Sequence, residues 1–181
     1  MDEQRAFLIE IARRLERAGI PYMVTGSVAL AAYSVPRMTR DIDVVVEIGP
    51  SDAERMVALF AEDCFIESDA VKRAAESRDM FNVIHNAWIT KADFIVRKDE
   101  PYRKTEFGRR RKVDVDGVAL WIVAPEDLIL SKLWWSRAAP SERQEADVRG
   151  LLAVAGLDRA YLDRWATDLG VGEALRRLRG A

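Results

Sequence analysis

Two aspartates, Asp41 and Asp43, stand two residues apart at the start of a segment in which residue character alternates as far as Ile48. This period of two predicts a β-strand, so both carboxylates project from one face, with α-carbons roughly 6.5 to 7 Å apart. Two like charges this close are unfavourable unless a cation lies between them. Hard carboxylate oxygens favour Mg²⁺ or Mn²⁺. The pair therefore predicts a site for a hard divalent cation.

A third carboxylate is expected near this pair. Two-metal phosphoryl transfer places its ions about 3.5 to 4 Å apart and normally needs a further acid. Asp93 is the best candidate, because it interrupts an alternating apolar segment that runs from Lys91 to Val96. One alternative stays open for Asp41 and Asp43, since aspartates at the start of a strand are also typical of a turn or a cap.

Gly26 and Ser27 follow a short apolar segment, 22–25, and precede a segment of small residues, 28–33. This order predicts a strand, a turn and a helix. Backbone N–H groups and a serine hydroxyl at the start of a helix can face a triphosphate, where the helix dipole favours negative charge. A glycine turn with Ser27 as the N-cap is the alternative. Thirteen residues separate Ser27 from Asp41, and this combination is more specific than either part.

Several cations are candidates for phosphate contact. Arg37 and Arg40 precede the aspartates closely in the sequence. Each arginine is expected either to contact phosphate or to form an ion pair with the carboxylates. The segment from Arg97 to Lys112 contains eight Lys or Arg against three Asp or Glu, so it either guides a nucleic acid backbone or forms a solvated hairpin. Lys132 lies among apolar residues of a predicted helix, where a lysine can also extend to water along its apolar stem.

The remaining aromatic and reactive side chains are expected to be structural. Three tryptophans lie on the apolar faces of predicted helices: Trp134, Trp135 and Trp165. We expect them to make core or interface contacts, with base stacking as the alternative. His85 lies within a strand pattern, and Cys64 has no base beside it in the sequence, so we expect both to be inert.

The composition is typical of a folded globular protein, since 49% of the 181 residues are hydrophobic and 32% are charged. A formal charge of -2 and a pI of about 5.6 give no general electrostatic reason for nucleic acid binding. The single cysteine excludes an internal disulfide, and the single histidine excludes a Cys/His zinc cluster. The longest apolar run, Val118 to Ala124, is too short to span a bilayer, so we expect a cytoplasmic protein.

Periodicity predicts an α/β (α+β) fold, in which a mixed sheet with flanking helices is followed by a helical tail. We expect one domain over residues 1–124 and a helical subdomain over 125–181. Strands are predicted over 22–25, 41–48, 80–86, 89–96, 113–116 and 118–123. Helices are predicted over 7–18, 28–33, 126–136, 158–169 and 171–179. Two further helices are predicted to begin at capping boxes, one at Ser51/Glu54 and one at Ser141/Gln144. The segment 69–78 is either a loop or a short helix.

The segments Val24-Thr-Gly-Ser-Val-Ala-Leu and Arg37-Met-Thr-Arg-Asp-Ile-Asp-Val-Val-Val resemble the signature of the DNA polymerase β-like nucleotidyltransferase superfamily. Within that superfamily the chain resembles the branch of AbiEii-type toxins and their uncharacterised bacterial relatives. This similarity runs through most of the chain, and it is carried by Met80-Phe-Asn-Val-Ile-His, Lys91-Ala-Asp-Phe, Pro125-Glu-Asp-Leu-Ile-Leu-Ser-Lys-Leu and Ser141-Glu-Arg-Gln.

The resemblance implies a role for each matching residue. The implied nucleotide-binding residues are Gly26, Ser27, Arg40 and Lys132, and the implied catalytic metal ligands are Asp41, Asp43 and Asp93, the last of which activates the attacking hydroxyl. Two features depart from the branch. A basic and acidic cluster usually follows the lysine, whereas this chain has Arg143-Gln-Glu-Ala-Asp147. The chain is also short for a full toxin, so we expect the substrate-binding domain to be either reduced or missing.

The implied activity is metal-dependent transfer of a nucleoside monophosphate from a nucleoside triphosphate, such as ATP, to a hydroxyl, with Mg²⁺ or Mn²⁺ as cofactor. Two acceptors stay open: RNA, as in toxin-like enzymes, or a small molecule such as an aminoglycoside or lincosamide. An antitoxin-like protein partner is also implied, and no membrane partner is expected. A catalytically silent nucleotide-binding or partner-binding module of the same fold is the alternative, because fold does not fix function.

Overall fold

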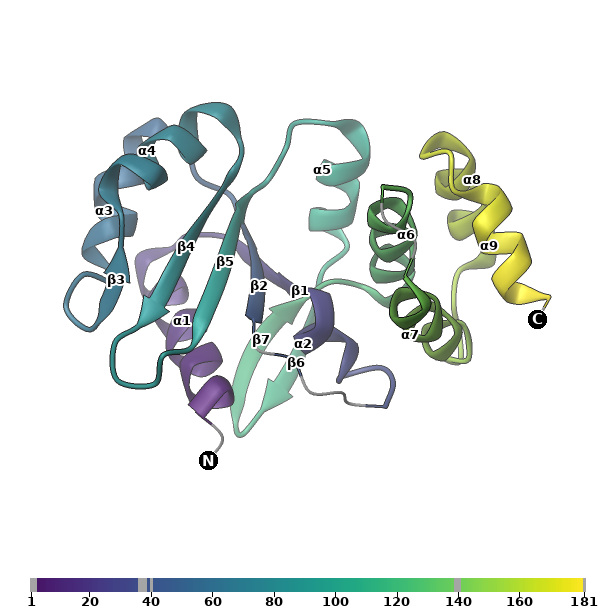
Figure 1. The fold of residues 1–181 in the computed structure, drawn as a ribbon, viewed down its shortest axis with the longest axis horizontal. Coiled ribbons are helices and arrows are strands. Elements are labelled where there is room, and N and C mark those ends of the chain that lie inside the picture. The colour runs from purple at the N-terminus through teal and green to yellow at the C-terminus, as the bar shows by residue number, and fades with distance from the viewer. Residues whose placement is uncertain (1–2, 36–38, 40, 139–140, 181) are drawn as a thin grey trace.

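The computed structural model describes residues 3–35, 39, 41–138 and 141–180. These residues form a seven-stranded sheet, in the order β3-β4-β5-β2-β1-β7-β6, with helices around it (Figure 1). The pairs β2/β5 and β1/β7 are parallel and the other neighbouring pairs are antiparallel. The strands are β1 (Tyr22–Thr25), β2 (Asp41–Val46), β3 (Cys64–Ile66), β4 (Met80–His85), β5 (Lys91–Val96), β6 (Arg111–Val115) and β7 (Val118–Ile122). The predicted mixed α/β class is confirmed.

Helices cover one face of the sheet and extend beyond its β7 side (Figure 1). They are α1 (Glu3–Ala18), α2 (Gly26–Leu30), the 3₁₀-helix η1 (Pro50–Asp52), α3 (Ala53–Ala58), α4 (Ser68–Ser77), α5 (Pro101–Gly108), α6 (Pro125–Ser136), α7 (Glu142–Leu152), α8 (Arg159–Asp168) and α9 (Gly172–Arg179). No helix among the described residues combines the length and the apolar character that crossing a bilayer requires.

The core lies between the sheet and the helices α1, α3 and α4. Phe7 of α1 packs edge-on against the ring of His85 on β4, and Phe60, just after α3, packs against Phe94 on β5. Phe7, Phe60 and Phe94 are completely buried, and each such side chain contributes about 1.5 to 3 kcal/mol through loss of apolar surface from water. Along β2 the odd positions, which begin with Asp41, are more exposed than the even ones. The core therefore holds the carboxylates of β2 on the opposite face of the sheet.

That opposite face is open over β3, β4 and β5. Phe65 on β3 pairs with Ile84 on β4, and Ile84 pairs with Lys91 on β5, so the three side chains share a face. Met80 lies on the same face, because it pairs with Ile95. Phe65 is 62% exposed and Met80 is 48% exposed. Phe65 and Met80 are thus two separate exposed apolar side chains on the face that carries Lys91, and the exposed Asn82 lies between Met80 and Ile84.

Some local elements differ from the sequence prediction. The undecided segment 69–78 is the helix α4, and the strand β3 and the helix α5 were not predicted. The Ser51/Glu54 capping box is wrong, because it is Asp52 that accepts the N–H of Gly49, at 2.9 Å. The predicted cap at Ser141 is confirmed, since its hydroxyl accepts the N–H of Gln144.

The helical tail is joined to α5 and the following residues by a buried polar network. Asp127 on α6 is completely buried, and its carboxylate accepts hydrogen bonds from Arg109 Nε at 3.0 Å and from the Tyr161 hydroxyl at 2.6 Å. Burial raises the pKa of Asp127, while the hydrogen bonds from Tyr161 and Arg109 act against this. Because buried charges need such partners, this network sets how α6 and α8 lie against the rest of the protein.

Candidate active site

Four charged residues share the open face where β2 and β5 begin. The two strands are parallel, with Asp43 opposite Asp93 and Asp41 opposite Lys91. Directly opposite residues on neighbouring strands project from the same face, and the strands are about 4.8 Å apart. The fold therefore brings the three aspartates singled out in the sequence onto one small area of the sheet.

Gly26 lies directly against one of these carboxylates. It follows Thr25, the register partner of Asp43 on β1, and its φ of +64° falls in the left-handed region that favours glycine. A Cβ at this position would lie 2.0 Å from Asp43 Oδ2, so a larger residue cannot fit without displacing the carboxylate. Ser27 is not the N-cap of α2, as its alternative interpretation required, because the N-cap is Thr25.

The three carboxylates differ in exposure. The side chain of Asp41 is 49% exposed and that of Asp93 is 12% exposed. Burial raises the pKa of Asp43, and the charges of Asp93 and Asp41 raise it further, whereas Lys132 and Lys91 lower it. A hydrogen bond to Asp93 raises the pKa of Lys91. The site thus concentrates negative charge and depends on nearby cations.

The donor set fits a hard divalent cation. Asp93 Oδ1 is buried and has no hydrogen-bond partner among the residues that the structure describes, and such an oxygen is costly unless a cation or donor reaches it. Carboxylate oxygens are the ligands that Mg²⁺ and Mn²⁺ prefer. Within the described residues these three acids do not bring one oxygen each within 4.8 Å of the others. The ammonium of Lys91 lies between two of them, 3.0 Å from Asp93 Oδ2 and 3.4 Å from Asp41 Oδ1.

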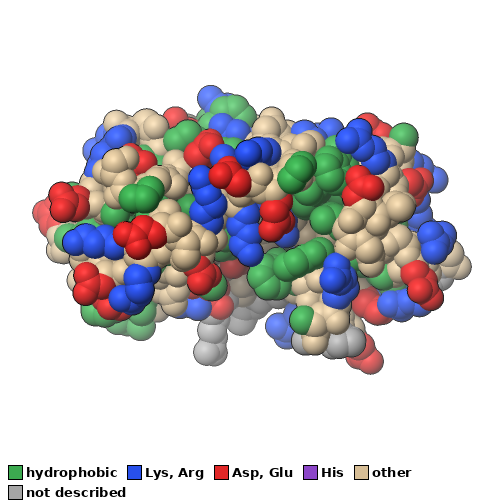
Figure 2. Space-filling model, turned by 90° about the horizontal axis from the view of Figure 1, so that it is seen from above, with side chains coloured by type: hydrophobic (Ala, Val, Ile, Leu, Met, Phe, Trp, Pro, Cys, Tyr) green, Lys and Arg blue, Asp and Glu red, His purple; other side chains and the backbone are tan. Residues whose placement is uncertain are grey.

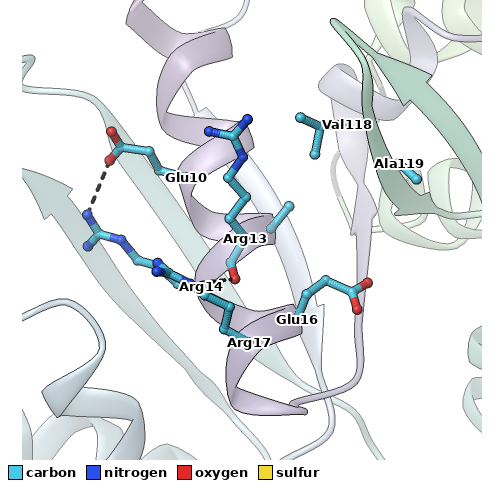
Figure 3. A pocket seen from close by; sticks show the side chains of 8 residues that line it. Glu10, Arg13, Arg14, Glu16, Arg17, Val118 and Ala119 are labelled. Atoms are coloured by element: carbon cyan, nitrogen blue, oxygen red, sulfur yellow. Dashed lines mark hydrogen bonds and ion pairs between the residues drawn. The ribbon is translucent and has the colours of Figure 1, made fainter.

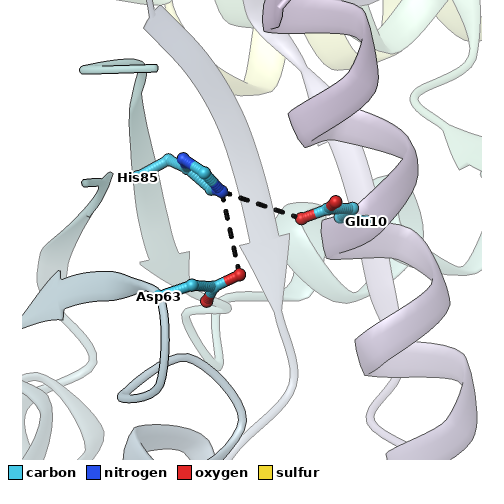
Figure 4. A group of neighbouring side chains, drawn as sticks. All are labelled: Glu10, Asp63 and His85. Atoms are coloured by element: carbon cyan, nitrogen blue, oxygen red, sulfur yellow. Dashed lines mark ion pairs between the residues drawn. The ribbon is translucent and has the colours of Figure 1, made fainter. Parts of the chain in front are cut away.

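Another group of acids and histidine does not fit a metal. Within the described part of the chain, only Glu10, Asp63 and His85 bring three ligand atoms within 4.8 Å of one another (Figure 4). Arg14 already forms ion pairs with both acids, at 2.5 Å from Asp63 and 3.2 Å from Glu10. His85 Nδ1 accepts the backbone N–H of Trp88 at 3.2 Å, so the neutral ring carries its proton on Nε2, the atom that faces the carboxylates. The arrangement suits an ion-pair cluster, as the structural interpretation of His85 expects.

Lys132 approaches the carboxylates but is held by α7. Its ammonium donates to Asp147 Oδ2 at 2.8 Å and to Gln144 Oε1 at 3.1 Å. Only 5% of the residue is exposed, so it is not a lysine that extends to water. Its charge also lowers the pKa of Asp43. Sequence reasoning missed Lys91 and the role of Asp147, although Lys91 precedes Asp93 by two residues in the same alternating pattern.

The remaining arginine, cysteine and tryptophan candidates differ in where the structure places them. Arg37 and Arg40 lie outside the described residues. Burial and a hydrogen bond to Asp63 raise the pKa of Cys64 to about 12, so its thiol stays protonated and inert near neutral pH. Trp165 belongs to the core, whereas Trp135 is 62% exposed and lies outside it. For Trp135 the interface contact stays a prediction.

The basic segment between residues 97 and 112 is largely neutralised by acids. It contains the helix α5, so the solvated-hairpin interpretation is wrong. Arg97 pairs with Glu47 at 2.5 Å, Arg103 with Glu106 at 2.8 Å, and Arg109 with two acids of α6, Glu126 and Asp127, at 3.0 Å each. On the face shown in Figure 2, blue and red side chains are interspersed. This pairing weakens the case for a phosphate-binding track.

A groove of about 550 Å³ lies elsewhere, between α1 and β7, and it contains none of the three aspartates. Figure 3 shows Arg13, Arg14 and Arg17 of α1 along it, together with Glu10 and Glu16. Three arginines and two glutamates line it, which leaves an excess of one positive charge.

Comparison with solved structures identifies the fold. The antibiotic-resistance factor ANT(2'')-Ia aligns over 100% of both chains, with a TM-score of 0.65 and 13% identity. A nucleotidyltransferase-like protein from Paracoccidioides brasiliensis aligns over 97% of this chain and 93% of its own, with a TM-score of 0.60 and 17% identity. The lincosamide antibiotic adenylyltransferase LnuA, bound to lincomycin, aligns over 86% of this chain and 99% of its own, with a TM-score of 0.58 and 12% identity.

The chain therefore has the nucleotidyltransferase fold, as the sequence resemblance implied. No protein-family model and no curated protein matches the sequence. At these identities the likeness defines the fold, and the toxin-like branch remains a hypothesis.

Proposed function

We propose that the protein transfers a nucleoside monophosphate from a nucleoside triphosphate to a hydroxyl acceptor, with Mg²⁺ or Mn²⁺ held by Asp41, Asp43 and Asp93. One observation carries this proposal: Asp43 lies opposite Asp93 on parallel strands while Gly26 packs directly against Asp43. A strand-end glycine beside paired carboxylates provides phosphate access and metal ligands in the same place. Asp93 Oδ1, which accepts no hydrogen bond from any described residue, is a further reason to expect a cation there.

In the proposed reaction the acceptor oxygen forms a bond to the α-phosphorus, and the bond from that phosphorus to the bridging oxygen breaks to release pyrophosphate. The bound metal supplies positive charge against the triphosphate and the developing negative charge. Asp93, the most buried of the three acids, accepts the proton of the attacking hydroxyl. Lys132 supports the phosphates as a nearby positive charge. Gly26 and Ser27, together with Arg40, complete the proposed nucleotide contacts.

We further propose a small hydroxyl compound with an apolar face as the acceptor. The open face beside Asp93 carries the exposed side chains of Phe65 and Met80, which suit an apolar molecule and not a polyanion. Five of the eight cations of the basic segment are paired with acids, so less positive charge is left for an RNA backbone than the sequence suggests. The antibiotic adenylyltransferase LnuA, which has the same fold, also acts on a small molecule.

The test is transfer of radiolabel from each of the four α-³²P nucleoside triphosphates, with Mg²⁺, to either a pool of small hydroxyl compounds or a pool of RNAs. We expect label in the small-molecule pool, and none with Asp43→Asn or Asp93→Asn. Label in RNA would instead favour a toxin-like enzyme. No transfer with any triphosphate, although the nucleotide binds, would favour the catalytically silent module.

A further inference from the structure

Lys91 holds an unusual position within the acidic group. Its ammonium donates to Asp93 Oδ2 at 3.0 Å and also lies 3.4 Å from Asp41 Oδ1. The side chain comes from β5 at the position directly opposite Asp41, and it is 35% exposed. It therefore bridges two strands and two of the three proposed metal ligands.

The charges around this ammonium are not balanced. Among the described residues that share this face of β2 and β5, three carboxylates and one ammonium leave two more negative than positive charges, which one divalent cation would neutralise. The residue Asp93 is only 9% exposed, and its Oδ2 binds Lys91. Its Oδ1 is buried, without a hydrogen-bond partner in the described part of the chain. A single ammonium thus satisfies only part of this donor set.

A metal and this ammonium cannot occupy the space between Asp41 and Asp93 together. A cation that binds both carboxylates needs oxygen distances of about 2.0 to 2.1 Å, and the lysine nitrogen lies where the two acids converge. Lysine is suited to leaving this place, because its ammonium is a compact, strongly hydrated charge on a flexible stem. The partial exposure of its side chain gives it a path toward solvent.

We propose that Lys91 is an internal counter-cation, which stabilises the three carboxylates before metal binds, gives up its place to the divalent cation, and then binds the triphosphate. This inference rests on the proposed function, because it assigns Lys91 to the same metal and nucleotide site. Before loading, Lys91 reduces repulsion among Asp41, Asp43 and Asp93. After loading, its ammonium remains at the edge of the site, within reach of phosphate oxygens that bring further negative charge.

A purely structural ion pair predicts different behaviour. If Lys91 only held β2 and β5 together, its replacement would lower stability and leave the intrinsic affinity for metal and nucleotide unchanged. A competing counter-cation instead makes two affinities move in opposite directions when it is removed. Metal alone should bind more tightly, and the metal–nucleotide complex should bind more weakly.

The experiment compares the full chain with Lys91→Met and with Lys98→Met, a control that removes an exposed lysine just beyond the end of β5. Free Mn²⁺ is titrated by electron paramagnetic resonance without nucleotide, and Mg²⁺ complexes of each of the four triphosphates are titrated by calorimetry. For Lys91→Met we expect Mn²⁺ to bind roughly tenfold more tightly and the best triphosphate complex roughly tenfold more weakly, which is about 1.4 kcal/mol each. Lys98→Met should match the unmodified protein in both titrations.

Each outcome decides a different point. Equal Mn²⁺ affinity in the unmodified protein and Lys91→Met would overturn the counter-cation role and leave the proposed metal site standing. Tighter Mn²⁺ binding with unchanged triphosphate binding would overturn the second half of the proposal, the phosphate contact. Absence of Mn²⁺ binding in both proteins would overturn this inference together with the proposed function. Circular dichroism of each variant confirms that the compared proteins are folded.

Discussion

Asp43 and Asp93 lie directly opposite each other on the parallel strands β2 and β5, on the face of the sheet that the helices α1, α3 and α4 leave open. The chain between these two strands includes the elements α3, β3, α4 and β4. Since burial and the two neighbouring acids raise the pKa of Asp43, the pair is held together against its own repulsion. This stored repulsion makes the pair sensitive to metal.

The first prediction follows from that repulsion. Asp43→Asn should raise the melting temperature without metal, because it removes one of three clustered charges. It should also abolish the further rise that Mn²⁺ causes in the unmodified protein, a stabilisation of about 2.7 kcal/mol at a hundred times Kd. Differential scanning fluorimetry with and without Mn²⁺ measures both effects. Asp168→Asn, at an exposed position on α8, is the control, and an Mn²⁺ shift that survives in Asp43→Asn would place the metal elsewhere.

A second prediction concerns the close approach of Gly26 to Asp43. Gly26→Ala should lower the free energy of unfolding by about 1 to 2 kcal/mol, because alanine is strained in the left-handed backbone conformation. Overpacking should lower it by roughly a further 1 to 3 kcal/mol, because the new Cβ would lie 2.0 Å from Asp43 Oδ2. Chemical denaturation measures the sum. Gly117→Ala is a matched control, since Gly117 has a φ of +78° and nothing within 4 Å of its virtual Cβ. Similar losses in the two variants would show that the contact with Asp43 is unimportant.

The sequence was sufficient to place Asp41, Asp43 and Asp93 on strands, because an alternating pattern fixes which side chains share a face. The sequence could not predict the parallel pairing of β2 with β5, since this register depends on how the whole chain between the two strands folds. Lys91 was overlooked for the same reason: its partner Asp41 is fifty residues away in the chain. Local periodicity carries no information on such a contact.

Local signals also failed where tertiary packing dominates. The strand β3 has only three residues, Cys64–Ile66, too few to show a period of two. The helix α5 was not predicted because its charged residues, such as Arg103 and Glu106, suggest an exposed segment. In the fold, Glu106 is only 5% exposed. Their ion pair and the hydrogen bond from Ser131 to Glu106 make this burial acceptable.

A third prediction tests acid sensitivity at the pair formed by Asp63 and Arg14. The hydrogen bond from Arg14 lowers the pKa of Asp63 to about 2, below an unfolded value of about 3.9. The stabilisation is therefore present above about pH 4 and is lost as pH falls toward 2. Asp63→Asn should lower the free energy of unfolding at pH 7 by roughly 1 kcal/mol or less, since the side chain is 37% exposed.

Urea denaturation of Asp63→Asn and the unmodified protein across pH 2 to 7 provides the measurement. The two stability curves should converge as pH falls through that window, because the carboxyl of the unmodified protein becomes neutral. Glu62→Gln, which changes an exposed neighbouring acid, should keep a constant offset from the unmodified protein. A constant offset for Asp63→Asn as well would show that its charge contributes nothing to the pH dependence.

The last prediction concerns Lys132, which is buried and bound to Asp147 at 2.8 Å. A surface lysine could be replaced without loss of stability, but removing one member of a buried ion pair costs roughly 3 kcal/mol or more. Lys132→Ala should therefore lower the free energy of unfolding by about that amount. It should also weaken triphosphate binding by roughly 1.5 to 3 kcal/mol, the range for hydrogen bonds to charged groups.

A double-mutant cycle with Asp147→Asn separates the two roles of Lys132. If the lysine serves folding through Asp147, the stability losses of the single variants should be strongly non-additive, because both break the same ion pair. Its effect on the nucleotide should persist in the Asp147→Asn background, where the ammonium still faces the site near Asp43. Denaturation and calorimetric titration of the four proteins measure both quantities. Triphosphate affinity that does not change between Asp147→Asn and the double variant would restrict Lys132 to holding α6 against α7.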